Sequence, residues 1–128
     1  MSNKKTIFIA EDNPTNMKLI NDILSYQGYA IIQATDGKMA LERIKENKDI
    51  IDLILMDVQL PEMDGISVIK KIKSDDSTKN IPIFVISAYA MENDIKNARE
   101  AGCNEYITKP INVQNFIKLV NEVFSPVK

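Results

Sequence analysis

The chain contains no histidine. This absence excludes a Ser-His-Asp or Cys-His catalytic centre, a histidine zinc ligand and a phosphohistidine carried by this chain. Cysteine is almost absent as well, since Cys103 is the only one. A single cysteine cannot form an internal disulfide, which fits a protein of the reducing cytosol.

Long apolar runs and an excess of basic residues are also missing. The apolar run after the basic amino terminus ends at Ala10, where Glu11 and Asp12 interrupt it, so it is too short for a signal peptide or a membrane span. A net charge of −2 and a pI near 5.2 argue against a nucleic-acid-binding surface. We therefore expect a soluble, cytoplasmic protein with no nucleic-acid or membrane partner.

The length of the chain limits its organisation. With 128 residues it fits one domain and leaves no room for a second module. We expect residues 1–128 to form this single domain, whose output must then come through its own surface.

Strand-like and helix-like segments alternate along the chain. Each short apolar run is followed by a longer segment with helical periodicity, which is typical of βαβ units. The expected strands are Thr6–Ala10, Ala30–Ala34, Leu53–Asp57, Ile83–Ser87 and Glu105–Thr108. Right-handed crossovers then favour an α/β fold with a five-stranded parallel sheet in the order 2-1-3-4-5 and helices on both faces, a flavodoxin-like three-layer sandwich.

Local signals place the helices and turns between these strands. Asn13 and Pro14 are typical of an N-cap and a first helical residue. The periodicity from Val113 onward predicts a last helix that ends near Phe124. Asp36-Gly37 and Met63-Asp64-Gly65 are interpreted as turns.

Polar residues follow several of the expected strands. Glu11 and Asp12 follow the first, Asp57 ends the third, Ser87 ends the fourth and Lys109 follows the fifth. The carboxyl ends of parallel strands meet at one edge, where open α/β folds bind ligands. Clustered carboxylates resist joint ionisation unless a cation compensates them, and Mg²⁺ prefers such oxygen ligands. We therefore predict a Mg²⁺ site beside an aspartate nucleophile, Asp57, with Lys109 pairing first with the carboxylate and then with a phosphoryl oxygen.

Taken singly, these residues have ordinary structural interpretations. Asp12-Asn13-Pro14 suits helix capping, Asp57 a turn, and Lys109 a solvated strand end. Their joint placement at the carboxyl ends of strands favours the chemical interpretation.

Several motifs together resemble the receiver domain of two-component response regulators, which belongs to the CheY-like superfamily, over essentially the whole chain. The motifs are Glu11-Asp12-Asn13, Ile54–Pro61, Met63-Asp64-Gly65, Val85–Ala88 and Thr108-Lys109-Pro110. Further stretches resemble single-domain DivK-type regulators and the receivers of hybrid kinases, among them Asn16–Leu19, Gln27–Tyr29 and Ala88–Met91. Serine at 87 and tyrosine at 106 are mild departures from the commonest pattern.

The resemblance implies a role for each matching residue. Asp57 accepts the phosphoryl group, and the carboxylates of Glu11, Asp12 and Asp57 with the Gln59 backbone carbonyl hold Mg²⁺. Lys109 contacts the phosphoryl group. Ser87 swings to bond it, and Tyr106 changes rotamer in response. The resemblance also implies a cis peptide between Lys109 and Pro110.

The implied function is that of a phosphorylation-controlled interaction protein. A histidine kinase or a histidine phosphotransfer protein donates the phosphoryl group, and a downstream protein binds the face between Ser87 and Phe124. Enzymatic activity is limited to the domain's own phosphorylation and slow autodephosphorylation.

Two other classes are compatible with the fold. A flavodoxin-like nucleotide or flavin carrier needs a phosphate-cradling loop after the first strand, where Glu11 and Asp12 would repel phosphate. An aspartyl-phosphate hydrolase usually has its nucleophile after the first strand, whereas Asp57 follows the third.

Overall fold

The computed structural model describes residues 4–89 and 91–125. These residues form five strands and five helices in strict alternation. In chain order the elements are β1 (Thr6–Ala10), α1 (Pro14–Tyr26), β2 (Ala30–Ala34), α2 (Gly37–Glu46), β3 (Ile51–Asp57), α3 (Gly65–Lys73), β4 (Ile83–Ser87), α4 (Glu92–Ala101), β5 (Glu105–Thr108) and α5 (Val113–Phe124). The alternation and four of the five strand ranges agree with the sequence prediction.

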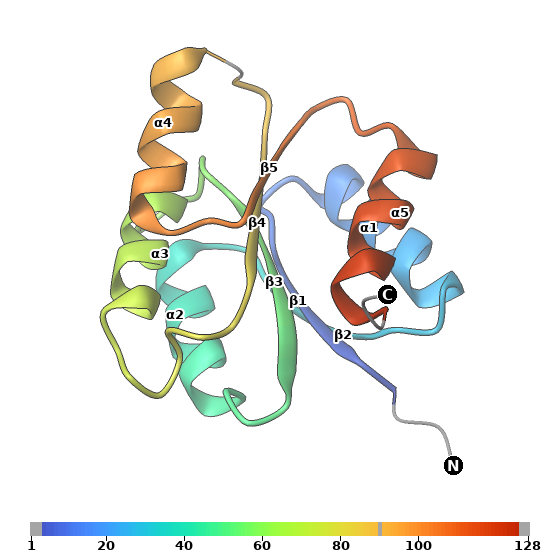
Figure 1. Ribbon diagram of the computed structural model, residues 1–128, viewed down its shortest axis with the longest axis horizontal. Coiled ribbons are helices and arrows are strands. Elements are labelled where there is room, and N and C mark those ends of the chain that lie inside the picture. The colour runs from blue at the N-terminus through green and yellow to red at the C-terminus, as the bar shows by residue number, and fades with distance from the viewer. Residues whose placement is uncertain (1–3, 90, 126–128) are drawn as a thin grey trace.

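The strands form one parallel sheet in the order β2-β1-β3-β4-β5, which confirms the predicted topology. Helices α1 and α5 cover one face, and α2, α3 and α4 cover the other (Figure 1). The fold is therefore the expected three-layer sandwich. None of the helices in the described part of the chain combines the length and the apolarity needed to cross a bilayer.

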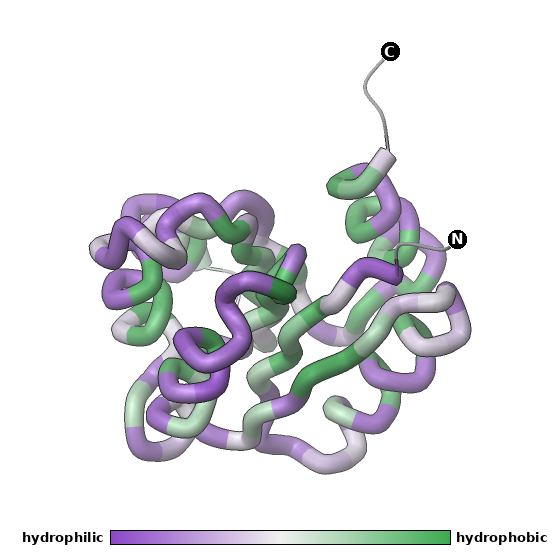
Figure 2. Tube along the Cα trace, turned by 90° about the horizontal axis from the view of Figure 1, so that it is seen from below, coloured by the Kyte–Doolittle hydropathy of each residue, from purple (hydrophilic) through white to green (hydrophobic). Residues whose placement is uncertain are grey.

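Two apolar cores lie on the two faces of the sheet. Because successive strand residues point to opposite faces, Ile7 and Ile9 pack toward α1 and α5, whereas Phe8 and Ala10 pack toward α2, α3 and α4. Figure 2 shows the consequence as hydrophobic strands between helices that carry hydrophilic stretches. Both faces of the central strands are buried, which explains why these strands read as continuous apolar runs in the sequence.

Strand β3 begins two residues earlier than the sequence predicted, at Ile51 rather than Leu53. Asp52 interrupts the apolar pattern there. Its carboxylate accepts a hydrogen bond from the backbone N–H of Thr6 at 2.8 Å, and the register of β1 with β3 shifts between Thr6 and Ile7. A polar residue is thus accommodated inside the strand by a contact that local periodicity does not reveal.

Asp36-Gly37 and Asp64-Gly65, interpreted above as turns, are instead the starts of helices. Asp36 and Asp64 are the N-caps of α2 and α3, and their side chains accept hydrogen bonds from the third following residue. Asn13 and Asn112 cap α1 and α5 in the same way. Side-chain caps of this kind satisfy N–H groups that a helix leaves unpaired at its first turn. They also fix where the loops at the carboxyl edge of the sheet end.

Candidate functional site

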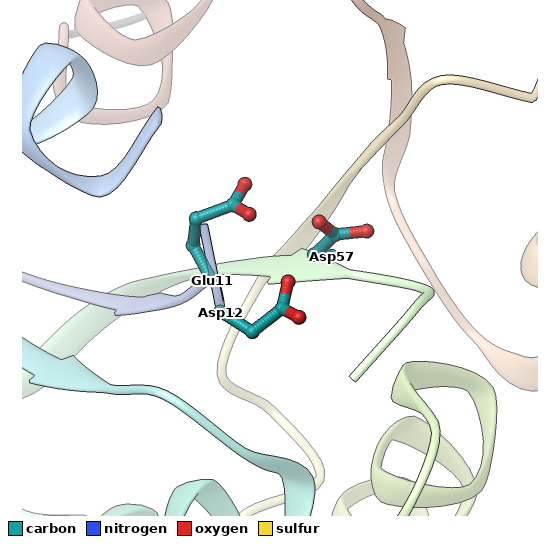
Figure 3. Close-up of side chains that lie close together, drawn as sticks. All are labelled: Glu11, Asp12 and Asp57. Carbon is teal, nitrogen blue, oxygen red and sulfur yellow. The ribbon is translucent and has the colours of Figure 1, made fainter. Parts of the chain in front are cut away.

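Three carboxylates converge at the carboxyl edge of the two central strands. Glu11 and Asp12 follow β1, and Asp57 ends β3, its direct neighbour in the sheet. One carboxylate oxygen from each residue lies within 4.8 Å of the other two. Figure 3 shows the three side chains together at the ends of these strands. The predicted convergence of Glu11, Asp12 and Asp57 is therefore observed.

Two of these carboxylates are buried. Glu11 is 2% exposed and Asp57 is 5% exposed, whereas Asp12 is exposed. Carboxylates are rarely buried to this extent unless they are paired with a cation.

The Lys109 ammonium provides that pairing. Its Nζ donates a hydrogen bond to Glu11 Oε1 at 2.9 Å and another to Asp57 Oδ2 at 2.8 Å. The lysine reaches the cluster because β5 ends beside β4 and the backbone N–H of Lys109 donates to the Ser87 carbonyl. The Lys109–Pro110 peptide is cis, as the resemblance implied. Lys109 compensates one of the three carboxylate charges, and a divalent cation would compensate the other two.

The environment shifts the pKa values of two groups in the cluster. Burial raises the pKa of Glu11 and outweighs the hydrogen bonds from Lys109 and from the backbone of Asn13, which lower it. Burial alone would lower the pKa of Lys109, but its hydrogen bonds to Asp57 and Glu11 outweigh burial and raise it. Lys109 is therefore a stable ammonium at neutral pH. A further cation nearby would favour the ionised form of Glu11.

Gln59 contacts Asp57 through its backbone. The Gln59 N–H donates a hydrogen bond to Asp57 Oδ1 at 3.0 Å, which orients the carboxylate. The side chain of Gln59 points elsewhere, since its amide nitrogen donates to the Tyr89 hydroxyl at 2.9 Å. The Gln59 N–H thus lies beside the acidic cluster, and the role of the Gln59 carbonyl as a metal ligand stays a prediction.

Ser87 and Tyr106 are connected through the backbone of Tyr89. The Tyr89 N–H donates to the buried Ser87 Oγ at 3.1 Å, and the Tyr106 hydroxyl donates to the Tyr89 carbonyl at 2.6 Å. These three residues line a cavity of about 140 Å³ between β4 and α4. Sequence reasoning named Ser87 and Tyr106 and included Tyr89 in the segment Ala88–Met91, but it missed this connection, because it runs through main-chain atoms that carry no sequence signal.

Two glycines beside the site were interpreted only as turn residues. A Cβ on Gly65 would lie 2.1 Å from the Asp57 carbonyl oxygen, and one on Gly37 would lie 1.7 Å from that of Met63. Each glycine follows an aspartate N-cap, so an Asp-Gly pair at a predicted helix start is the signal that could have revealed this packing.

A doubly wound sheet in this order, with acidic residues after the first and third strands and a lysine after the fifth, defines the class of CheY-like signalling domains. The sequence matches the family described as the response regulator receiver domain over residues 7–121. The chain belongs to this family. It is a receiver domain of a response regulator of two-component signalling. This family assignment favours neither of the two alternative classes, the flavin carrier and the hydrolase.

Relatives and solved structures agree with this assignment. The polar-differentiation response regulator DivK of Brucella anthropi is 43% identical over 116 residues, which are 91% of this chain and 93% of DivK. The receiver domain of a sensor histidine kinase from Pseudomonas aeruginosa, with a magnesium ion in its active site cleft, superposes with a TM-score of 0.86 at 30% identity, covering 95% of this chain and 99% of that one. A chain of the CheX-CheY-BeF3-Mg²⁺ complex from Borrelia burgdorferi superposes with a TM-score of 0.88 at 29% identity. The match covers 95% of this chain and 90% of that one.

Proposed function

We propose that Asp57 is the phosphoacceptor and that its phosphorylation switches the surface that binds downstream proteins. One observation carries the proposal. The buried Asp57 carboxylate lies within a cluster of three carboxylates and accepts a hydrogen bond from the Lys109 ammonium. A carboxylate that is buried, paired with a neighbouring cation and held at a ligand-binding edge is suited to attack on phosphorus.

In the proposed step, an oxygen of the Asp57 carboxylate forms a bond to phosphorus. The bond from phosphorus to the donor histidine nitrogen breaks at the same time, and the imidazole leaves with that electron pair. The donor is a histidine kinase or a histidine phosphotransfer protein, because this chain has no histidine of its own. The Gln59 N–H orients the attacking carboxylate through Oδ1.

The residues present fit a Mg²⁺ ion. Glu11, Asp12 and Asp57 offer carboxylate oxygens close together. By the family resemblance, the backbone carbonyl of Gln59 would complete the site. Bound Mg²⁺ would neutralise charge as one anion approaches another. The Pseudomonas receiver and the Borrelia complex, which both contain magnesium, support this proposal by similarity.

Lys109, Ser87 and Tyr106 are proposed to detect the phosphoryl group. Lys109 already contacts Asp57 and would exchange this contact for one to a phosphoryl oxygen. Ser87 ends the strand beside β3, and its hydroxyl would donate to the same group. The rearrangement would reach Tyr106 through Tyr89, to which both residues are hydrogen-bonded.

The downstream protein is proposed to bind the face formed by α4, β5 and α5, between Ser87 and Phe124. Tyr89 and Met91 expose large side chains at the start of this face, and α4 carries an open apolar hollow around Ile95. Ala90, which is part of the same predicted segment, lies outside the described residues.

We propose that residues 1–128 form one receiver domain, since the family match and the sheet together span residues 6–121. Its enzymatic activity would be limited to its own phosphorylation and slow dephosphorylation. A cytoplasmic location suits the buried free thiol of Cys103.

Intact-mass measurement after incubation with a small phosphodonor and Mg²⁺ tests the proposal. We expect one added phosphoryl group, stable in acid and labile in base, that is absent from Asp57→Ala and from samples with EDTA. Asp12→Asn serves as a matched variant, because it keeps the phosphoacceptor and removes one metal ligand. Equal modification of the parent and Asp57→Ala would refute the assignment.

A further inference from the structure

Lys73, the last residue of α3, carries an amine that the proposed function does not use. Its Nζ donates a hydrogen bond to the Lys79 carbonyl at 2.9 Å and another to the Ile81 carbonyl at 3.0 Å. Both acceptors belong to the loop between α3 and β4. In the described part of the chain, the lysine ion pairs involve Lys18, Lys79 and Lys109 but not Lys73. The partners of Lys73 are therefore neutral main-chain oxygens rather than carboxylates.

The Lys73 side chain is half-buried where three segments meet. A Cβ on Gly102, at the turn between α4 and β5, would lie 2.7 Å from Lys73 Cγ, so the aliphatic part of the lysine packs closely over that turn. In the loop before β4, the buried Thr78 hydroxyl donates to the Ile72 carbonyl at 2.7 Å. The end of α3, this loop and the turn are thus held together, and Lys73 contacts all three.

This environment suits the neutral form of the Lys73 amine. Burial lowers the pKa of Lys73 below its ordinary value, and the charge of a nearby ionised Cys103 raises it by less. A neutral amine has two hydrogens and one lone pair, so the two carbonyls can accept both hydrogens and leave the lone pair free. At Lys109 burial also acts to lower the pKa, but hydrogen bonds to two carboxylates outweigh it and raise the pKa. Lys109 therefore stays an ammonium with no lone pair, whereas Lys73 can act as a nucleophile.

We propose that Lys73 is a modification site for acyl phosphates, small molecules in which a carboxylic acid is joined to phosphate. In the step, the Nζ lone pair forms a bond to the acyl carbon. The bond from this carbon to the bridging oxygen breaks, and phosphate leaves with that electron pair. The carbonyls of Lys79 and Ile81 stabilise the positive charge that develops on Nζ, which then releases one proton to water. The inference uses neither Asp57 nor Mg²⁺, so it does not rest on the proposed function.

Acylation would weaken the junction that Lys73 forms. The amide product has one N–H and no charge, so one of the two carbonyls loses its partner. We therefore expect the acylated protein to hold the loop before β4 less firmly and to be less stable. Lys73→Arg is the matched variant, because its guanidinium keeps a charge and several donors but stays protonated and does not react with acyl phosphates.

Incubation with acetyl phosphate in EDTA, followed by peptide mass spectrometry, tests the site. EDTA prevents the Mg²⁺-dependent transfer proposed for Asp57, and exposed Lys71 on the same helix is the internal control. We expect Lys73 to be acetylated severalfold faster than Lys71 in the folded protein. In urea, where the surrounding carbonyls are no longer held in place, the two rates should be similar. A rate at Lys73 equal to or below that at Lys71 in the folded protein would overturn the proposal.

A stability measurement tests the consequence. We expect treatment with acetyl phosphate to lower the urea midpoint of the parent and to leave that of Lys73→Arg nearly unchanged. Equal lowering in both proteins would show that other lysines cause the loss and would refute the role of Lys73 at the junction. If Lys73→Arg does not fold, the acetylation rates of the parent decide. A chain that is not phosphorylated at Asp57 would contradict the proposed function and leave these outcomes unchanged.

Discussion

The side-chain amide of Gln59 donates a hydrogen bond to the hydroxyl of Tyr89, with the two atoms 2.9 Å apart. This contact joins the loop after β3 to the segment after β4. Both residues line an open hollow that also includes Asp12 of the acidic cluster. Water that hydrolyses an aspartyl phosphate has to approach in line with the bond to Asp57, and by the family resemblance these two side chains flank that path.

We predict that Tyr89 slows dephosphorylation. Its ring is bulky and carries no carboxylate with which to activate water, so it obstructs the attack. Tyr89→Ala or Tyr89→Glu should release phosphate severalfold faster. This corresponds to an activation free energy lowered by less than about 1.4 kcal/mol, since that amount changes a rate tenfold. Tyr89→Phe keeps the ring and should change the rate little. Identical phosphate-release time courses for the parent and Tyr89→Ala would remove the basis for this claim.

Lys109 should stabilise the fold only while its carboxylate partners lack another cation. Lys109→Met keeps most of the side-chain volume but leaves buried Glu11 and Asp57 without their ammonium. Breaking a fully buried ion pair in this way costs roughly 3–5 kcal/mol, and the partial exposure of Lys109 lowers this cost. We expect a lower free energy of unfolding in EDTA, measured by urea denaturation, and tighter Mg²⁺ binding than in the parent. Lys18→Met removes an exposed ion pair with Asp22 and should change stability far less, because solvent screens such pairs. Equal losses in the two variants would contradict the assigned pairing.

Ser87 and Lys109 should be needed for switching rather than for metal binding. Ser87→Ala and Lys109→Ala would each remove a proposed contact to the phosphoryl group, and only contacts that differ between the two states shift a population. Lys109→Ala also removes the ion pairs that Lys109 forms with Glu11 and Asp57. Moving an equilibrium from mostly off to mostly on takes roughly 5.5 kcal/mol, so losing one charge-assisted bond should be visible. We expect both variants to bind Mg²⁺ and to show a reduced NMR response at Tyr106 to beryllofluoride. A full NMR response at Tyr106 in both variants would refute the proposed switch.

The Cys103 thiol should be unreactive in the folded protein. Burial is the main reason that the pKa of Cys103 lies above its ordinary value, so less of the reactive thiolate forms at neutral pH. Because the unfolded chain loses this proton more readily, the thiol lowers stability as the pH rises through its pKa in the unfolded state. We expect slow alkylation of the native protein at pH 7 and fast alkylation in denaturant, followed by mass spectrometry. Rapid alkylation of the native protein would contradict this prediction and show that the region around Cys103 opens to solvent.

The output face should bind its target only when Asp57 is phosphorylated. Met91 is 73% exposed at the start of α4, and Tyr26, at the end of α1, is 90% exposed on the opposite layer. Met91→Ala and Tyr106→Ala should weaken capture of downstream proteins by beryllofluoride-loaded protein, whereas Tyr26→Ala should not. If captured proteins bind equally well without beryllofluoride and to the substituted variants, the target binds another surface.

The sequence predicted the element order, the sheet topology and most strand ends, because apolar periodicity and turn residues are local. It also predicted which polar residues meet, since Glu11, Asp57 and Lys109 each follow a buried strand and parallel strands share one carboxyl edge. Their roles remain predictions of the resemblance.

Other features depended on the tertiary structure. The start of β3 at Ile51 depends on the contact of Asp52 with Thr6, 46 positions away in sequence. The link from Ser87 to Tyr106 runs through main-chain atoms of Tyr89, and the start of α2 meets the loop after β3 where the Gly37 N–H donates to the Pro61 carbonyl. Neither residue type nor spacing identifies the partners in these contacts, although an Asp-Gly pair at a helix start indicates that the glycine is closely packed. They arise only when packing brings distant backbone groups within hydrogen-bonding distance, because each such group needs a partner once it leaves water.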